Sequence, residues 1–415
     1  MSNIHNDAQS MIKTIIADNM PTQAVVNALK AHNFTGNIHL VAIGKAAWTM
    51  AKAASDYLGD RLVKGIAVTK YEHSQGSLPR IDIYEAGHPV VDENTISATK
   101  KCIELAEALT EKDELLFLIS GGGSALFEAP MDGISLEDLQ GLTSQLLSSG
   151  ADIVEMNMIR KRLSQVKAGR FAMLAEPCPV FAVILSDVLG DRLDTIASGP
   201  AVPDASTVED AQRVVSKYNL ELTELQKKYL TTETPKEITN VKTAITGSVR
   251  TLCESAAKTA GELGYTPFVL TATMDCEARE AGRMLASIAM DVHEGRSSIT
   301  RPCAIIAGGE TVVTLKGKGK GGRNQELAFA AARGIKGLPD TVVFSLGSDG
   351  TDGPTDAAGG ITDGTSFAAL KEKGIDFDRV LADNDAYHGL QAIGGLIITG
   401  PTGTNVNDVS VVLMK

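Results

Sequence analysis

Short apolar runs alternate with stretches of helical periodicity along most of the first half of the chain. Five runs have the length and continuous hydrophobicity of buried strands: 38–43, 64–69, 81–86, 114–120 and 180–186. Between them, apolar residues recur with helical spacing at 44–58, 93–109 and 152–171. This alternation is typical of βαβ units, so it predicts an α/β fold with a doubly wound, parallel sheet.

The pattern changes between about residues 204 and 240, where the sequence is polar and helical and contains no buried strand. Strand-like runs then resume, at 242–247, 264–272, 303–309, 311–316, 341–347, 396–399 and 409–414. A chain of 415 residues is also long for a single core. We therefore predict two α/β domains, residues 1–235 and 236–415.

Composition and charge exclude several classes of protein. The net charge of −12 opposes binding to nucleic acid or to an anionic membrane. No apolar run approaches the roughly 18 residues of a membrane span, and the first residues lack the pattern of a secretory signal. The 5 cysteines are scattered without a C-x-x-C motif, which favours neither disulfides nor zinc. We expect a cytoplasmic protein.

In open α/β sheets, ligands bind where the strands end, so the residues that follow each predicted strand are the first candidates. Lys45 follows the first strand at the start of a helix, where anions are favoured. Ser120-Gly121-Gly122-Gly123-Ser124 follows the fourth, and its backbone N–H groups could approach an oxyanion. His88 follows the third and could touch a substrate. The alternatives are a surface lysine and a tight turn.

Carboxylates follow two further strands. Asp187 and Asp191 lie in SDVLGDRLDTIASGP, and Asp349 and Asp352 lie in the glycine-rich GSDGTDGPTDAAGG at 347–360. One or two carboxylates beside a phosphate-binding loop are what Mg²⁺ requires, whereas the spacing does not fit an EF-hand. These aspartates could instead cap turns or form Asx-turns.

The segment 316–323, KGKGKGGR, holds 4 glycines, 3 lysines and 1 arginine between a strand-like run and a helical pattern. It fits G-x-G-x-x-G formally, but the interleaved lysines favour a loop that binds phosphate by charge as well as by backbone N–H groups. Gly321, Gly322, Arg323 and Asn324 stand at the expected helix start. A disordered basic loop is the alternative.

Two more strand ends are polar, since Glu310 follows 303–309 and Asn405 lies in GPTGTN after 396–399. Together the polar strand ends predict a large polar cleft formed by both domains. Positive groups and carboxylates in one cleft suit phosphoryl transfer, which depends on positioning and on electrostatic stabilisation of spread charge.

The motifs resemble those of the class II glycerate 2-kinases, which carry a MOFRL domain at the C-terminal end. The resemblance covers nearly the whole chain and rests on GKAA (44–47), GHPVVD (87–92), SGGGSAL (120–126), SDVLGDRLDTIASGP (186–200), GGETVVT (308–314), GGRNQELAF (321–329) and GSDGTDGPTDAAGG (347–360). Val91 departs from the pattern, because the family often has proline there.

The resemblance implies a kinase that uses ATP and Mg²⁺ to convert D-glycerate to 2-phosphoglycerate. It implies a Rossmann-like N-terminal domain, a C-terminal α/β domain of MOFRL type and an active site in the inter-domain cleft. We accordingly assign catalysis to Lys45, Arg323 and Asp187. ATP binding is assigned to Ser120, Gly121, Gly122, Gly123, Ser124, Gly321, Gly322 and Asn324. Mg²⁺ is assigned to Asp187, Asp191, Asp349 and Asp352, and substrate contact to His88, Glu310 and Asn405.

Two other functions stay open. Members of the family have also been labelled hydroxypyruvate reductases, which predicts NAD(P)H binding, although Asp340 lies before the next strand and not at its end, where the ribose would need an acid. A sensor of sugar acids or nucleotides is the second. The substrate could also be a related hydroxy acid. We expect small-molecule ligands only, with no nucleic acid or membrane partner, and a monomer or a small homo-oligomer.

Overall fold

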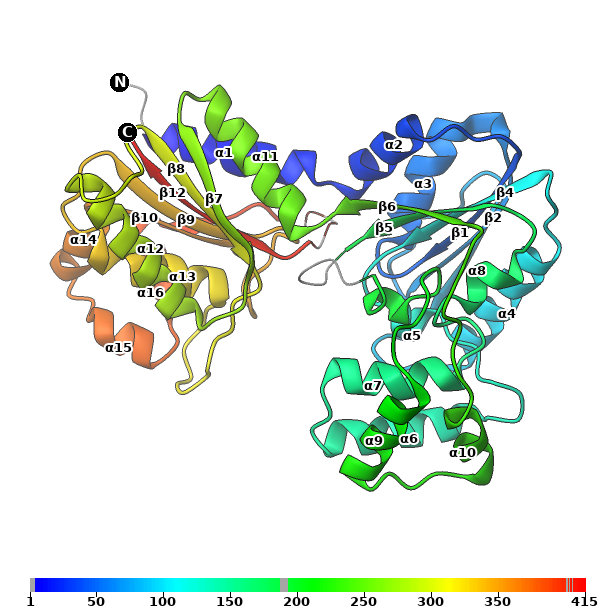
Figure 1. Cartoon of the computed structure of the whole chain (residues 1–415). Coiled ribbons are helices and arrows are strands. Elements are labelled where there is room, and N and C mark those ends of the chain that lie inside the picture. The colour runs from blue at the N-terminus through cyan, green and yellow to red at the C-terminus, as the bar shows by residue number, and fades with distance from the viewer. Residues whose placement is uncertain (1–3, 187–192, 401, 403, 405) are drawn as a thin grey trace. The chain divides into compact units, whose positions relative to one another are not determined.

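The computed structural model describes residues 4–186, 193–400, 402, 404 and 406–415. The chain divides into two compact units (Figure 1), one formed by Pro21–Thr246 and the other by Met1–Met20 together with Gly247–Lys415. The predicted boundary at 235/236 lies before the last strand of the first sheet, which carries that unit on to Thr246. No helix among the described residues is long and apolar enough to cross a membrane.

The Pro21–Thr246 unit contains a 6-stranded sheet with the order β3-β2-β1-β4-β5-β6. Its strands are β1 (Asn37–Ile43), β2 (Leu62–Lys70), β3 (Ile81–Ala86), β4 (Asp113–Ile119), β5 (Val180–Leu185) and β6 (Val241–Gly247). Strands β3, β2, β1, β4 and β5 pair in parallel. This is the strand order of a Rossmann fold, so the predicted parallel, doubly wound sheet is confirmed.

Helices cover this sheet and also form a separate cluster beside it (Figure 1). The helices of the unit are α2 (Pro21–Ala31), α3 (Ala47–Leu58), α4 (Glu93–Glu107), α5 (Gly123–Leu126), α6 (Leu136–Ser148), α7 (Ile153–Arg160), α8 (Arg170–Leu174), α9 (Val208–Tyr218) and α10 (Glu224–Leu230), with short 3₁₀ turns η1 (Gly59–Arg61), η2 (Lys161–Leu163) and η3 (Ile196–Ser198). Helices α6, α7, α9 and α10 share a core of their own, which includes Leu142, Ile159 and Val214.

The long helix predicted at 152–171 is wrong. Helix α7 ends at Arg160, η2 follows, and α8 begins only at Arg170. Ala168 and Gly169 between them have φ values of 56° and 79°, in the left-handed region that interrupts a helix. Lys167, just before them, is fully buried. Its ammonium group donates to the backbone carbonyl groups of Ser124 and Phe127. Helical periodicity alone did not reveal this break.

The second unit contains a mixed 6-stranded sheet with the order β11-β10-β9-β12-β8-β7. Its strands are β7 (Thr266–Met274), β8 (Cys303–Gly309), β9 (Thr341–Gly347), β10 (Gly359–Asp363), β11 (Leu396–Ile397) and β12 (Asp408–Met414). Among the described residues of this sheet, only β7 and β8 pair in parallel, and the other pairs are antiparallel. The predicted α/β class is confirmed, but the parallel rhythm does not extend through this sheet.

Two strand assignments in this unit differ from the prediction. The run at 311–316 is not a strand, since Val312 makes only an isolated bridge with Glu277. Strand β10 was missed because its sequence, GGITD, contains no apolar run. It pairs through its backbone, and Gly359 lies so close to β9 that a Cβ atom there would come within 1.9 Å of the Ser345 carbonyl oxygen.

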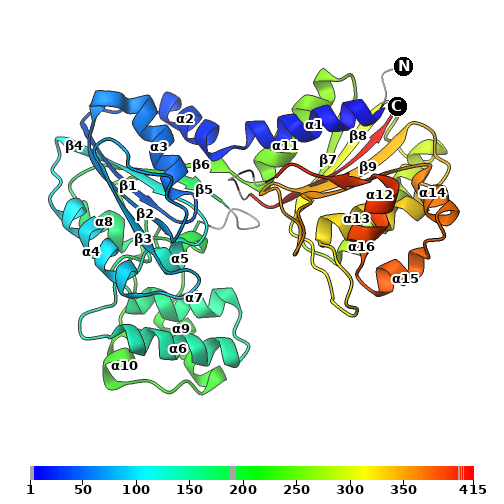
Figure 2. The same cartoon turned by 180° about the vertical axis from the view of Figure 1, so that it is seen from behind.

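The helices of the second unit lie on both faces of this sheet (Figures 1 and 2). They are α1 (Ile4–Asp18), α11 (Val249–Glu262), α12 (Ala278–His293), α13 (Arg323–Gly334), α14 (Ser366–Glu372), α15 (Phe377–Ala382) and α16 (Ala386–Ile393). Helix α1 packs on α11, and hydrogen bonds from Ser255 to Asp18 (2.8 Å) and from Tyr265 to Asp7 (2.7 Å) fasten it. The first helix of the chain therefore belongs to the C-terminal unit.

Candidate functional site

The first candidate site lies where β1 and β4 end in the Pro21–Thr246 unit. These strands are neighbours, and the chain runs from β1 to one edge of the sheet and from β4 to the other. Such a topological switch point is where doubly wound folds bind ligands. Lys45 follows β1 and Ser120 follows β4, so the sheet brings these two predicted site residues together, as the sequence indicated.

Hydrogen bonds hold the two strand ends to each other. The Lys45 N–H donates to the Gly121 carbonyl (2.9 Å), and the Ala46 N–H donates to the Ser120 hydroxyl oxygen (3.1 Å). The Ser120 hydroxyl in turn donates to the Ile43 carbonyl (3.0 Å). The Ser120 hydroxyl therefore links the two strand ends. Because its proton is already donated and it already accepts one hydrogen bond, it has little remaining hydrogen-bonding capacity for a ligand.

Gly44 permits this close approach. It has a φ of 106°, and a Cβ atom there would lie 2.4 Å from both the carbonyl oxygen and the hydroxyl oxygen of Ser120. Any other residue would therefore separate the two strand ends.

Lys45 and His88 meet over the glycine turn. A Cβ atom on Gly122 would lie 3.1 Å from the Lys45 Cε atom and 3.1 Å from the His88 Nε2 atom, so both side chains contact this glycine. Burial lowers the pKa of His88, and the nearby Lys45 and Lys70 lower it further. His88 is therefore neutral at pH 7, while the lysines make the turn locally positive.

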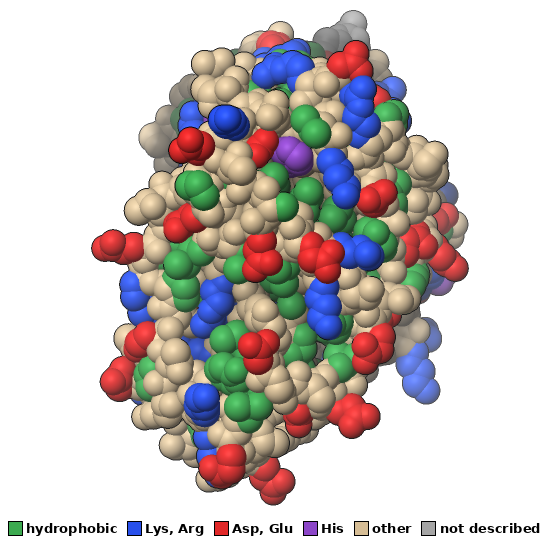
Figure 3. Space-filling model, turned by 90° about the vertical axis from the view of Figure 1, so that its right-hand side faces the viewer, with side chains coloured by type: hydrophobic (Ala, Val, Ile, Leu, Met, Phe, Trp, Pro, Cys, Tyr) green, Lys and Arg blue, Asp and Glu red, His purple; other side chains and the backbone are tan. Residues whose placement is uncertain are grey.

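The rest of the surface can be compared with this locally positive turn on one face of the molecule. On the face of the molecule that Figure 3 shows, acidic and basic side chains are interspersed, without a broad basic surface. The chain as a whole is strongly acidic. A small anion that reaches the glycine turn therefore meets a local reversal of charge, which favours a phosphate or carboxylate group over a polyanion.

The second half of the turn is supported from beneath. The Ser124 hydroxyl hydrogen-bonds with the Ser198 hydroxyl (3.0 Å). The ammonium group of Lys167 donates to the carbonyls of Ser124 (3.0 Å) and Phe127 (2.9 Å) and pairs with Glu128 (2.8 Å). Lys167 and Glu128 were not predicted from the sequence because both lie away from a strand end. The sequence signal for Lys167 was its position directly before Ala168-Gly169, where a glycine interrupts the helical pattern.

The second unit holds another group of predicted residues around Arg323, the first residue of α13. Its Nε and Nη2 donate to the two carboxylate oxygens of Asp408 (2.5 and 3.2 Å), and its Nη1 donates to Glu310 (3.0 Å). Burial alone would lower the pKa of Arg323, but Asp408 and Glu310 raise it. The guanidinium therefore stays charged and is held by a bidentate ion pair.

Asp408 was missed because the prediction considered only residues that follow strands. Strand β12 runs antiparallel to β8 and β9, so its first residue lies opposite Gly309 and Gly347, where those strands end. Asp408 is buried, and burial raises its pKa although Arg323 acts in the opposite direction. The available signal was a polar residue directly before an apolar strand.

Asp352 caps helix α13. Its carboxylate accepts hydrogen bonds from the backbone N–H groups of Asn324 (3.1 Å) and Gln325 (2.8 Å) and from the Asn324 side chain (3.3 Å). Burial raises the pKa of Asp352 to about 6, although these donors lower it. The helix N-terminus that was predicted to receive phosphate thus holds a carboxylate of the protein. A phosphate there would have to displace it.

The glycine- and lysine-rich segment before Arg323 packs against residues 383–385. Backbone N–H groups of Lys316 and Lys318 donate to the side chains of Asn384 (2.8 Å) and Asp383 (3.0 Å). Cβ atoms on Gly317 and Gly319 would approach the chain at 383–385 to within 2.3 and 2.5 Å. Most of this segment is therefore ordered by protein acceptors, and close packing explains its glycines without a bound dinucleotide.

Of the four predicted metal ligands, the structure describes Asp349 and Asp352, and Asp352 is bound to the start of α13. Asp349 forms an Asx-turn in which its Oδ1 accepts from the Thr351 N–H (3.0 Å). The predicted metal ligands Asp187 and Asp191, and the predicted substrate contact Asn405, lie outside the described residues. Within the described part of the chain, no group of three or more His, Cys, Asp or Glu side chains could hold a metal ion.

Comparisons with known proteins match the whole chain. Residues 7–231 match the model described as a domain of unknown function, DUF4147, and residues 303–408 match that of the MOFRL family. The D-glycerate 2-kinase of Thermotoga maritima is 52% identical over 98% of this chain and 97% of its own. The glycerate 2-kinase of Pyrococcus horikoshii is 42% identical, over 95% and 93%.

A solved structure and a third relative are also similar to this chain. The crystal structure of glycerate kinase from Thermotoga maritima superposes with a TM-score of 0.95 at 52% identity, and the match covers 99% of each chain. A protein of Agrobacterium vitis named putative hydroxypyruvate reductase is 37% identical over 96% of this chain and 92% of its own.

Proposed function

This chain belongs to the glycerate 2-kinase family that combines a DUF4147 and a MOFRL domain, and we propose that it transfers a phosphoryl group from ATP to the 2-hydroxyl group of D-glycerate. Two relatives named for this activity are similar over nearly their full length. The related name of hydroxypyruvate reductase belongs to relatives of lower identity. The glycines at 317 and 319, which formally fit a dinucleotide fingerprint, are required by packing against residues 383–385.

The observation that carries the proposal is the positive glycine turn at the switch point. Lys45 and His88 contact Gly122, and the turn follows the strands between which a Rossmann fold binds its ligand. We assign Lys45 a charge-holding role towards either a phosphate of ATP or the carboxylate of glycerate. Neutral His88 is assigned a hydrogen bond to substrate. The glycine turn from Ser120 to Ser124 is assigned a contact to phosphate, chiefly through the N–H groups of Gly121 and Gly122, which donate to no protein acceptor in the described structure.

Arg323 is proposed to stabilise charge on the transferred phosphoryl group. Asp408 accepts hydrogen bonds from two of its nitrogen atoms, Nε and Nη2. Its Nη1 pairs with Glu310, whose side chain is 45% exposed. We propose that phosphate replaces Glu310 at Nη1 and that Asp408 keeps the guanidinium in place. Glu310 is then free to contact substrate. Phosphoryl transfer gains most from such positioned cations, because the transition state spreads negative charge over its oxygens.

A bound Mg²⁺ would supply positive charge to neutralise the phosphate oxygens during transfer. Among the proposed ligands, Asp349 fits best, because the described structure engages only its Oδ1. Both oxygens of Asp352 already accept hydrogen bonds from α13. Asp352 would therefore coordinate a metal only through remaining lone pairs. Asp187 and Asp191 are proposed alongside Asp349, and Gly321, Gly322, Asn324 and Asn405 remain proposed ligand contacts.

A coupled assay of ADP release tests the proposal, with ATP and a panel of C3 to C6 hydroxy acids as substrates. We expect D-glycerate to give the highest kcat/KM and phosphorus NMR to place the new phosphate on carbon 2. The proposal is wrong if purified protein forms no ADP with any acid of the panel but oxidises NADH with hydroxypyruvate. Binding of ATP without any turnover would instead identify a sensor.

A further inference from the structure

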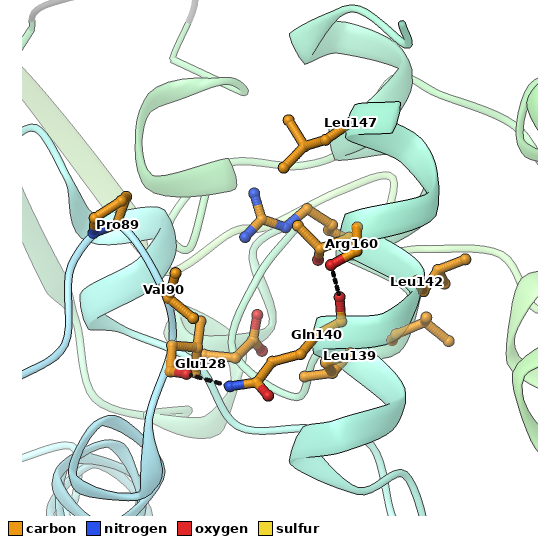
Figure 4. A pocket seen from close by; sticks show the side chains of 12 residues that line it. Pro89, Val90, Glu128, Leu139, Gln140, Leu142, Leu147 and Arg160 are labelled. Atoms are coloured by element: carbon orange, nitrogen blue, oxygen red, sulfur yellow. Dashed lines mark hydrogen bonds between the residues drawn. The ribbon is translucent and has the colours of Figure 1, made fainter. Parts of the chain in front are cut away.

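A cavity of about 190 Å³ lies in the Pro21–Thr246 unit, between the segment that follows His88 and helix α6. Its walls are largely apolar and include Val90, Val91, Leu139, Leu142 and Leu147 (Figure 4). The cavity is smaller than the roughly 300–1,000 Å³ of pockets that hold drug-sized molecules, so it suits a small organic molecule and not a nucleotide. No residue of the glycine turn, nor Lys45 or His88, lines it.

One buried polar atom in this cavity lacks a partner. The Glu128 side chain is 3% exposed, and its Oε2 pairs with the Lys167 ammonium group (2.8 Å). Its Oε1 is buried and accepts no hydrogen bond within the described chain. An unsatisfied buried carboxylate oxygen is costly, so a donor supplied by a ligand would be favourable here.

Arg160 provides a second polar group. It is the last residue of α7, and Figure 4 shows its guanidinium group reaching into the space between α6 and the segment that holds Val90. Across the described residues its guanidinium group makes no hydrogen bond or ion pair; burial lowers its pKa, and the nearby Glu128 carboxylate acts in the opposite direction. A guanidinium group offers a planar fork of donors that matches a carboxylate.

The charges around the cavity favour an anion. Arg160 and Lys167 contribute two positive charges, and Glu128 contributes one negative charge, which leaves one positive charge in excess. Because Lys167 already neutralises Glu128, the free Oε1 needs only a neutral donor such as a hydroxyl group. The leucine side chains of α6 offer apolar contact for an aliphatic chain.

We propose that this cavity binds a small aliphatic hydroxycarboxylate. The carboxylate pairs with the fork of Arg160, the hydroxyl group donates to Glu128 Oε1, and the aliphatic chain packs against Leu139, Leu142 and Leu147. D-Glycerate shares the polar groups but has no aliphatic chain. The site therefore prefers acids with a longer apolar chain, and it stands independently of the proposed kinase activity.

Isothermal titration calorimetry with α-hydroxyisocaproate tests this site on the full chain without ATP. We expect saturable binding by the wild-type protein and binding at least about tenfold weaker in Arg160→Met, which loses a charge-assisted pair. Isocaproate, which lacks the hydroxyl group, and D-glycerate, which lacks the chain, should also bind about tenfold more weakly to the wild type.

Two variants guard against indirect effects. Leu147→Asp changes an exposed side chain at the cavity, 63% accessible, so it should preserve the fold and still weaken binding. Arg213→Met removes an exposed arginine of the same unit and should leave binding unchanged. Absence of saturable binding at millimolar concentration, or equal binding by wild type, Arg160→Met and Leu147→Asp, would overturn the proposal.

Discussion

The two glycine-rich segments of this chain look alike in sequence and differ in structure. In the Pro21–Thr246 unit, Gly121 and Gly122 donate to no protein acceptor in the described structure, and Lys45 and His88 lie against Gly122. In the other unit, the segment 316–320 donates its N–H groups to residues 383–385. Glycine combined with positive charge therefore identifies an anion site only where the backbone donors remain available.

The largest effect is expected from Arg323, the one cation of the second segment that we assign to catalysis. Arg323→Ala should lower kcat/KM by about 10²-fold or more, mainly through kcat, because its charge acts on the transition state. Arg323→Lys retains charge but cannot form the bidentate pair with Asp408, so it should recover only part of the activity. A folded Arg323→Ala variant within about threefold of wild type would remove Arg323 from the mechanism.

Gly319 should matter for stability and not for phosphate. A Cβ atom there would lie 2.5 Å from the Asp385 Cβ atom and 2.6 Å from the Asp383 carbonyl oxygen. Gly319→Ala should therefore destabilise the protein by about 1–3 kcal/mol, the usual cost of overpacking. Gly261→Ala is the matched control, since nothing lies within 4 Å of its added Cβ atom. Equal melting temperatures for Gly319→Ala and wild type would show that the packing argument is wrong.

Gly122, in contrast to Gly319, should matter for activity. Gly122→Ala places a methyl group against Lys45 and His88 and imposes a φ of 84° on alanine, which costs about 1–2 kcal/mol. We expect a clear rise in KM or fall in kcat that exceeds the effect of Gly319→Ala on the same constants. Steady-state kinetics on both variants, at a temperature where both are folded, makes the comparison. Loss of activity confined to Gly319→Ala would reverse our assignment of the two segments.

The smallest effect concerns pH. The folded-state pKa of Asp352, about 6, is raised above its ordinary value of 3.8, so the folded protein binds this proton more tightly than the unfolded chain does. The contribution of Asp352 to stability therefore falls as pH rises through this range. Asp352→Asn loses hydrogen bonds at every pH, but its deficit relative to wild type should shrink between about pH 4 and pH 7. Thermal unfolding of both proteins at about pH 4 and pH 7 measures this difference in stability. A stability deficit of Asp352→Asn that grows with pH would contradict the raised pKa of Asp352.

The sequence predicted the Rossmann-like sheet well, because its strands are continuous apolar runs such as β4 and β5. It also placed Lys45 and Ser120 together, since parallel strands end at the same edge. It marked Asp408 only as a polar residue before an apolar run, and it could not show that Asp408 lies opposite the ends of β8 and β9, which depends on the antiparallel direction of β12. Nor could it show that residues 383–385, far along the chain, supply acceptors to the lysine-rich segment. Both depend on tertiary pairing that local patterns do not contain.

The contrast between the two glycine-rich segments is tested by replacing one lysine at each of them. Lys45 lies against the glycine turn, whereas Lys320 lies over the Tyr387 ring, 4.2 Å from its centroid. Phosphorylation of D-glycerate should fall by about 10²-fold in kcat/KM for Lys45→Met and stay within about threefold of wild type for Lys320→Met. The contradicting result is an active Lys45→Met together with an inactive, folded Lys320→Met.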